Sequence, residues 1–166
     1  AGSEPEDPLH LYMRSGVNTI RLRLWFNPRD GRNALLPMLA LAKAAAGYHL
    51  DILLDIHYSD TWADPAHQAK PRAWQDMSGT ALQNAVREYT RDTIKAFNLQ
   101  GTPPAWVQLG NEIGHGFLWD DGRVEPGRDS NWIGPRRREW ACPSAKSTIP
   151  CTMRSGSGMS RLCIAT

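Results

Sequence analysis

Asn111 and Glu112 are the adjacent residues of this sequence that are best placed to do chemistry. They follow a short apolar segment, residues 106–109, whose Trp, Val and Leu favour a buried strand. Pro103 and Pro104 precede that segment and prevent a helix from running into it. In a barrel of parallel strands, catalytic residues lie at the carboxyl ends of the strands. A glutamate kept protonated there by partial burial would act as a general acid.

The alternative is that Asn111 and Glu112 are ordinary residues of a surface loop. Gly110 favours the functional interpretation, because a strand residue without a side chain lets backbone or ligand approach closely. For both side chains to line one cleft, the strand must end or bulge at this point. The residues that follow also suit a binding site, and they are Gly114, His115, Gly116 and Trp119.

Arg23 and His57 occupy the ends of two other predicted strands, residues 18–25 and 50–57. In the first strand, alternation places Arg21, Arg23 and Trp25 on one face. Neither face of a parallel barrel is solvated, so both arginines should have carboxylate partners. Arg23 would then keep a second carboxylate ionised, and His57 would form a hydrogen bond in the cleft.

Two other kinds of site fit the sequence less well. Asp55, His57 and Ser59 lie too close along one strand to form a nucleophilic triad. Glu112 and His115 have the spacing of a metal-binding pair on a helix, but the surrounding glycines argue against a helix there. We therefore expect neither a metal nor a cofactor.

The elements that must position these residues alternate along the chain. Helices are expected at residues 9–15, 33–46 and 80–97, and strands at 18–25, 50–57 and 106–111. This order predicts an α/β fold with a parallel sheet and right-handed crossovers. A doubly wound sheet is the rival fold, but the glycine-rich phosphate loop typical of it is missing.

Composition narrows the class of protein further. The chain has 166 residues, 41% hydrophobic and 22% charged, with a net charge of +2. These values are typical of a globular protein and favour neither a nucleic-acid nor a membrane partner. An eight-stranded barrel needs about 250 residues, so the chain predicts only part of one. Several of the seven tryptophans fall at predicted loops or strand ends, where they would suit stacking on sugar rings.

Residues 135–166 differ in character from residues 1–134. This basic segment follows neither a strand nor a helix period, and it holds all three cysteines, Cys142, Cys151 and Cys163. We expect a partial barrel domain over 1–134 and an irregular tail over 135–166, either disordered or translated from a shifted reading frame.

Four segments together resemble the arabinogalactan endo-β-1,4-galactanases, glycoside hydrolase family 53 of the (β/α)8 retaining glycosidases. The segments are GVNTIRLRLW at 16–25, LDIHYSDTWADP at 54–65, QLGNEI at 108–113 and GFLW at 116–119. They occur in the family's order and spacing, and the second is the most specific. The resemblance implies strands two to four of the barrel, with the first strand absent.

The resemblance also implies roles for individual residues. Glu112 matches the acid/base, Asn111 the residue that binds the sugar 2-hydroxyl, Arg23 the arginine that supports the nucleophile, and His57 a cleft residue. Six further residues are expected to contact substrate, namely Trp25, Asp60, Trp62, Asp64, His115 and Trp119. The family's nucleophile, a second glutamate on the seventh strand, has no match here, so this chain alone should be inactive.

The implied partner is a polysaccharide, β-1,4-galactan, cleaved by a retaining two-carboxylate mechanism. The implied location is secreted or extracellular, with the periplasm as an alternative, and the full-length parent is expected to be monomeric. Two rival functions stay open: another endo-glycanase of the clan acting on mannan or xylan, and a non-catalytic carbohydrate-binding remnant.

Overall fold

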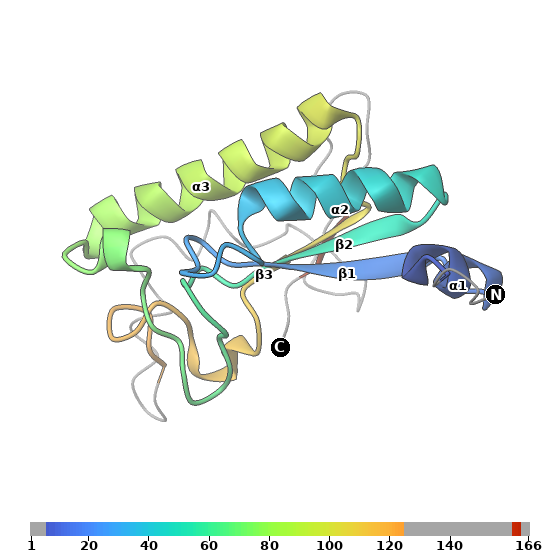
Figure 1. The fold of residues 1–166 in the computed structure, drawn as a ribbon. Helices are drawn as coiled ribbons and strands as arrows, with labels where there is room; N and C mark the ends of the chain where they lie inside the picture. Colours follow the sequence, from blue (N-terminus) through green and yellow to red (C-terminus); the bar gives the residue numbers. More distant parts are fainter. Residues whose placement is uncertain (1–5, 125–160, 164–166) are drawn as a thin grey trace, which may run out of the picture.

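A parallel sheet with two helices against one of its faces makes up most of the structure (Figure 1). The computed structural model describes residues 6–124 and 161–163. Its elements in chain order are α1 (Pro8–Arg14), β1 (Thr19–Leu24), α2 (Leu35–Gly47), β2 (Asp51–Ile56), η1 (Arg72–Trp74), α3 (Gly79–Gln100), β3 (Trp106–Leu109), η2 (Ile113–His115) and β4 (Arg161–Cys163). The strand order is β1-β2-β3-β4, and every neighbouring pair is parallel. The predicted α/β fold with parallel strands is confirmed.

The core lies between the sheet and the two long helices, α2 and α3, which run over the same face in Figure 1. Alternate residues of β1 and β2 point into it, since successive side chains of a strand face opposite sides. The fully buried members of the strands are Leu22, Leu24, Ile52, Leu54, Ile56 and Val107, and they pack with Met38, Ala42, Leu82 and Phe97 of the helices. The alternating apolar residues of the strands are thus buried on one face of the sheet.

The opposite face of the sheet is polar. It carries Arg21 and Arg23 from β1, Asp55 from β2 and Gln108 from β3, with His57 directly after β2. Asp55 and His57 are buried, whereas both arginines are exposed. In the parallel register Arg23 is paired with Asp55 and Ile56 with Leu109. The carboxyl ends of the three strands therefore lie at one edge of this polar face.

The predicted helices and strands match the observed ones to within a few residues at each end. Gly16 (φ +86°) follows α1, and Gly101 (φ +84°) directly follows α3; both adopt the left-handed conformation that ends a helix. None of the helices within 6–124 is both long and apolar enough to cross a membrane.

Within the segment 135–166, the three residues of β4 pair in parallel with β3. The edge of β3 offers unpaired backbone N–H and C=O groups, and any extended segment of the chain can add to such an edge. The other predictions for 135–166, and the proposed boundary at residue 134, fall outside the described residues.

Candidate active site

Arg21 and Asp55 form the charged centre of the strand-end cluster. The guanidinium of Arg21 donates to Asp55 Oδ2 from Nη2 at 2.7 Å and from Nε at 3.1 Å. Asp55 is fully buried and also accepts hydrogen bonds from Gln108 Nε2 at 3.0 Å and from His57 at 3.1 Å. Four donors therefore compensate for the loss of water around this carboxylate.

The hydrogen bonds of His57 fix its protonation. The backbone N–H of Ala63 donates to Nδ1 at 3.2 Å, so Nδ1 carries no proton. Nε2 must then hold the proton and donate it to Asp55 Oδ2. His57 is therefore a neutral imidazole that orients Asp55. With both ring nitrogens engaged, it has none left for Ser59, which argues against the nucleophilic triad.

Asn111 is held in one orientation by three contacts. Its Oδ1 accepts from Arg21 Nη2 at 2.6 Å and from Gln108 Nε2 at 3.4 Å, while its Nδ2 donates to the carbonyl of Ala63 at 2.8 Å. The other amide hydrogen of this buried side chain has no acceptor within residues 6–124. The amide of Asn111 thus joins β1, the loop after β2 and the end of β3.

Glu112 lies directly after this fixed residue, at the point where the strand has ended and the chain turns. Gly110 (φ +82°) and Glu112 (φ +52°) are both left-handed, and a Cβ on Gly110 would lie 2.5 Å from Cγ2 of Ile113. The close approach predicted at Gly110 is thus made by a side chain. Tyr58, two residues after the end of β2, is also left-handed (φ +55°), so strained residues stand at two adjacent strand ends.

The partial burial expected for Glu112 is wrong. Its side chain is exposed and has no hydrogen-bond or ion-pair partner within 6–124. The physical reason is the left-handed backbone, which turns the chain out of the strand direction before Glu112. The carboxylate is therefore presented to solvent beside Asn111, where a ligand can reach it.

Residues 58–78 form a long loop between β2 and α3, and two of its carboxylates stabilise its conformation. Asp60 accepts from the backbone N–H of Asn27 and of Arg72, both at 3.0 Å. Asp64 accepts from Ala66 N at 2.8 Å and from His67 Nδ1 at 2.9 Å. The bond from the His67 side chain, followed by that from Ala66, lowers the pKa of Asp64. Both residues were expected to contact substrate, but their carboxylate oxygens already accept hydrogen bonds from this loop and from Asn27.

Gln68 connects that loop to the turn after β3 that carries Asn111 and Glu112. Its Nε2 donates to the carbonyl of Asn111 at 2.7 Å and to that of Asp64 at 3.0 Å, and lies 3.5 Å from the carbonyl of Glu112. The backbone carbonyl of Gln68 accepts a hydrogen bond from Trp119 N at 2.8 Å. This buried glutamine therefore positions the backbone on both sides of Glu112.

Aromatic rings surround the cluster. Trp62 is 41% exposed; the Arg23 guanidinium lies 4.9 Å from its ring centre, and His57 meets it edge-on at 5.4 Å. Trp25 packs against His57 at 6.3 Å. Arg23, for which a carboxylate partner was expected, thus lies over an aromatic ring instead. Trp62 offers the flat exposed surface that sugar stacking requires.

Trp119 and His115 lie on the segment after Glu112. Trp119 Nε1 donates to the carbonyl of His115 at 3.1 Å, and Arg123 lies 4.5 Å from the Trp119 ring centre. His115 is exposed at the end of η2. Among the described residues there is no cluster of three His, Cys, Asp or Glu side chains that could hold a metal ion.

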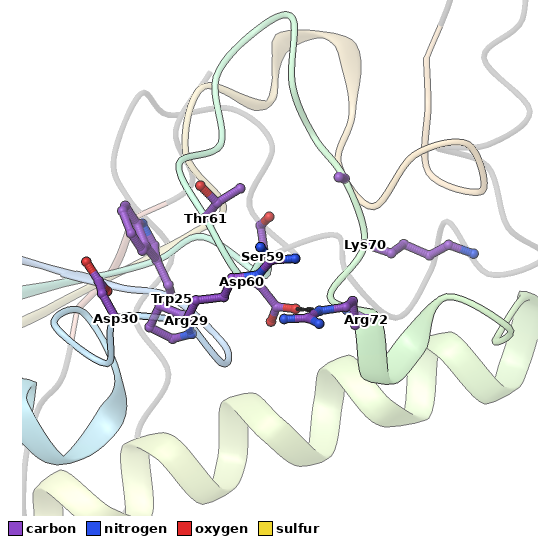
Figure 2. Close-up of a pocket in the computed structure, with 10 residues that line it drawn as sticks. Trp25, Arg29, Asp30, Ser59, Asp60, Thr61, Lys70 and Arg72 are labelled. Atoms are coloured by element: carbon purple, nitrogen blue, oxygen red, sulfur yellow. Dashed lines mark hydrogen bonds and ion pairs between the residues drawn. The ribbon is translucent and has the colours of Figure 1, made fainter.

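An open pocket of about 540 Å³ lies between the loops 25–30 and 59–72 (Figure 2). Trp25 and Asp60, two of the predicted substrate residues, line it together with Arg29 and Arg72. Glu112, Asn111 and His57 do not line it.

Arg21, Asp55, Gln68 and Gln108 belong to the site but were not among the predicted site residues. The sequence held a signal for the first two. Arg21 shares a face with Arg23, and Asp55 shares one with His57. Knowing which strands are neighbours, and in which register, would have paired them. Gln68 gives no such signal, because it acts from an irregular loop.

Comparisons with known proteins agree with this geometry. The family model described as glycosyl hydrolase family 53 matches residues 2–138. An arabinogalactan endo-β-1,4-galactanase of Thermothelomyces thermophilus is 43% identical over 129 residues, covering 77% of this chain and 37% of that protein. The arabinogalactan endo-β-1,4-galactanase of Humicola insolens is 39% identical over 134 residues, covering 80% and 38%.

Two solved structures resemble the fold closely. A fungal β-1,4-galactanase superposes with a TM-score of 0.69 at 40% identity, covering 75% of this chain and 37% of that one. The family 53 catalytic domain of Ignisphaera aggregans also gives 0.69, at 38% identity, covering 77% and 36%. The chain spans little more than a third of the length of the relatives it matches. The partial barrel expected from the sequence is confirmed, and the chain belongs to glycosyl hydrolase family 53.

Proposed function

We propose that the chain is the part of an endo-β-1,4-galactanase that supplies the acid/base residue, Glu112. The observation that carries this proposal is the exposed carboxylate of Glu112 beside an Asn111 that Arg21 holds in place. Family membership and the two galactanase relatives support galactan as the substrate. A polysaccharide does not diffuse across a membrane, which supports a place of action outside the cell.

The proposed reaction is a retaining double displacement. Such enzymes use two carboxyl groups about 5–5.5 Å apart, one as acid/base and one as nucleophile. Glu112 would protonate the leaving oxygen, and the free amide hydrogen of Asn111 would bind a sugar hydroxyl. The exposed ring of Trp62 would stack against a sugar ring of the same substrate.

The nucleophile is proposed to lie outside this chain. Of the carboxylates near the cluster, Asp55 is occupied by Arg21, His57 and Gln108, and Asp60 by two backbone N–H groups. Asp64 is occupied by His67 and Ala66. A carboxylate with its lone pairs engaged in this way is a poor nucleophile, so the chain alone should bind galactan without cleaving it.

The test measures binding by the 166-residue chain to β-1,4-galactan, β-1,4-mannan and β-1,4-xylan, using affinity electrophoresis. Galactan should bind most tightly, and Trp62→Ala should weaken that binding about tenfold, since an aromatic–sugar contact contributes about 1.4 kcal/mol. Tighter binding to mannan or xylan would favour the rival glycanase, and binding to none of the three would contradict the proposal.

A reducing-sugar assay on the same chain tests the mechanism. No release from galactan is expected, because one carboxyl group cannot complete a double displacement. In the longer protein, Glu112→Gln should lower the rate by about 10²–10⁴ and leave binding intact. Release by the chain alone that disappears in Glu112→Gln would show that a nucleophile lies within the 166 residues.

A further inference from the structure

The pocket between the loops 25–30 and 59–72 is a second place where this chain can hold a ligand (Figure 2). Its volume of about 540 Å³ lies within the range of small-molecule sites, about 300–1,000 Å³. The loop after β1 and the long loop after β2 line this pocket, whereas Glu112 and Asn111 do not. A ligand bound in it would therefore be separate from the reacting carboxylate.

The two acidic residues that line the pocket are already paired. Both oxygens of Asp60 accept backbone N–H groups, from Asn27 and Arg72. Asp30 accepts from Arg32 N at 3.1 Å and from Arg32 Nε at 2.9 Å. These bonds leave the acids little capacity to bind a cation or a sugar hydroxyl.

Two of the three basic residues are free to bind an anion. Lys70 is occupied by Asp121 at 2.7 Å and by the carbonyl of Met77 at 3.0 Å. Arg29, in contrast, is exposed and has no hydrogen-bond or ion-pair partner among residues 6–124. The side chain of Arg72 makes one loose contact, with Nε 3.9 Å from Asp60 Oδ2, and its terminal nitrogens are free within the same residues.

Ser59 adds a hydroxyl group to the lining of the pocket. This hydroxyl has no hydrogen-bond partner within the described part of the chain, and its oxygen is open to solvent. It is therefore available to a bound ligand. The half-buried ring of Trp25 adds a flat apolar surface to the same pocket.

We propose that this pocket binds a sugar residue that carries a carboxylate, that is, a uronic acid. Arg29 and Arg72 would donate to the carboxylate, since the planar guanidinium matches it with paired hydrogen bonds. Ser59 would bind a ring hydroxyl, and Trp25 would contact the ring face. The choice of a sugar rests on the proposed function; the choice of an anion rests on the free guanidinium groups.

The test titrates the 166-residue chain at low salt with trigalacturonate, its fully methyl-esterified form, β-1,4-galactotriose and inorganic phosphate, by calorimetry. Trigalacturonate should bind at least tenfold more tightly than its methyl ester, and the difference should shrink in 0.5 M NaCl because salt screens exposed charges. Arg29→Ala and Arg72→Ala should each weaken trigalacturonate about tenfold.

Matched variants decide whether trigalacturonate binds in this pocket or elsewhere on the chain. Arg91→Ala, which removes an exposed arginine of α3 paired with Asp92, should leave the affinity unchanged. Equal affinity for the acid and its ester would overturn the proposal, and so would phosphate binding as tightly as trigalacturonate. Loss of binding on replacing Arg136, Arg137 and Arg138, but not Arg29 or Arg72, would overturn it too.

Two variants separate binding of the acidic sugar in this pocket from binding of neutral galactan at the proposed active site. Trp62→Ala should weaken neutral galactan and leave the trigalacturonate affinity unchanged, since Trp62 does not line the pocket. Arg29→Ala should do the reverse. If the chain did not bind galactan, the trigalacturonate titration would therefore still test the pocket.

Discussion

Asp55 is the single residue on which the strand-end cluster depends. It is fully buried, and it connects Arg21 of β1, His57 after β2 and Gln108 of β3. A buried carboxylate is unfavourable unless every lone pair is satisfied, and here four donors satisfy it. The same contacts orient Arg21 toward Asn111.

Asp55→Asn should therefore destabilise the chain by about 2–4 kcal/mol. The variant removes the charge that Arg21 pairs with and replaces an acceptor oxygen with an NH2 group that faces donors. The cost stays below that of a fully buried pair because the Arg21 side chain is 48% exposed and can regain water. Urea unfolding measures the change. Asp51→Asn, on an exposed residue of the same strand, should change stability by less than about 0.5 kcal/mol.

The sequence allowed the positions of some residues of the cluster to be predicted, while their roles stay predictions. Asn111, Trp62 and His57 do lie around one cluster, because the ends of parallel strands share an edge of the sheet. The sequence could not decide between Arg21 and Arg23, since both lie on the same face of β1. Their difference comes from the diagonal geometry between strands, which places Arg21 on Asp55 and leaves Arg23 over Trp62.

At the scale of the element, the turn after β3 depends on Gly110. Gly110→Ala should destabilise by about 2–4 kcal/mol, from two separable causes. One is the positive φ, and the other is the contact of a new Cβ with Ile113. Gly101→Ala separates them, because Gly101 has nearly the same φ but open space around it. That control should cost about 1 kcal/mol. Equal losses in the two variants, measured by thermal unfolding, would contradict a steric role for Ile113.

The loop 58–78 should respond to acid through Asp64. Its pKa in the folded state is lowered by His67, so its contribution to stability is complete above the ordinary value of 3.8 and is lost as pH falls through the folded pKa. His67→Ala should raise the pKa of Asp64 toward that ordinary value. Carboxyl NMR titration measures the shift; His10→Ala, on α1, serves as the control and should not move it.

Element positions were more predictable than their connections. Periodicity and glycine stops located three helices and three strands, because each such signal is local. The strand β4 could not be predicted, since three residues of ordinary composition become a strand only by pairing with the free edge of β3. The hydrogen bond from Gln68 to the turn after β3 depends likewise on tertiary contacts.

At the scale of the whole molecule, β1 is an edge strand, because no strand among residues 6–124 and 161–163 pairs with its outer side. Asn18 and Leu24 accept backbone bonds from the β2 side, so the even-numbered residues of β1 face β2 and the odd-numbered ones face outward. Outward N–H and C=O groups favour pairing with a second chain. The leucines of the helix surfaces add to this tendency, with Leu36 and Leu99 each nearly 80% exposed.

The chain should therefore self-associate, and Thr19→Pro should reduce that association. Thr19 faces outward, so proline there removes an edge donor without breaking the ladder to β2. Ile20→Pro is the matched control, because it removes a bond to β2 and should unfold the sheet. Light scattering as a function of concentration measures association, and circular dichroism measures folding. Unchanged scattering in Thr19→Pro would argue that the exposed leucines, and not the strand edge, cause the association.

The left-handed backbone of Glu112 sets a limit on how this protein can be improved. A glutamate in that conformation is less stable than an asparagine or glycine, by about 1 kcal/mol. A laboratory selection for heat resistance alone would thus favour Asn or Gly at position 112 and discard the carboxylate. Engineering for stability should hold this position fixed and seek its gains elsewhere, on the helix face of the sheet.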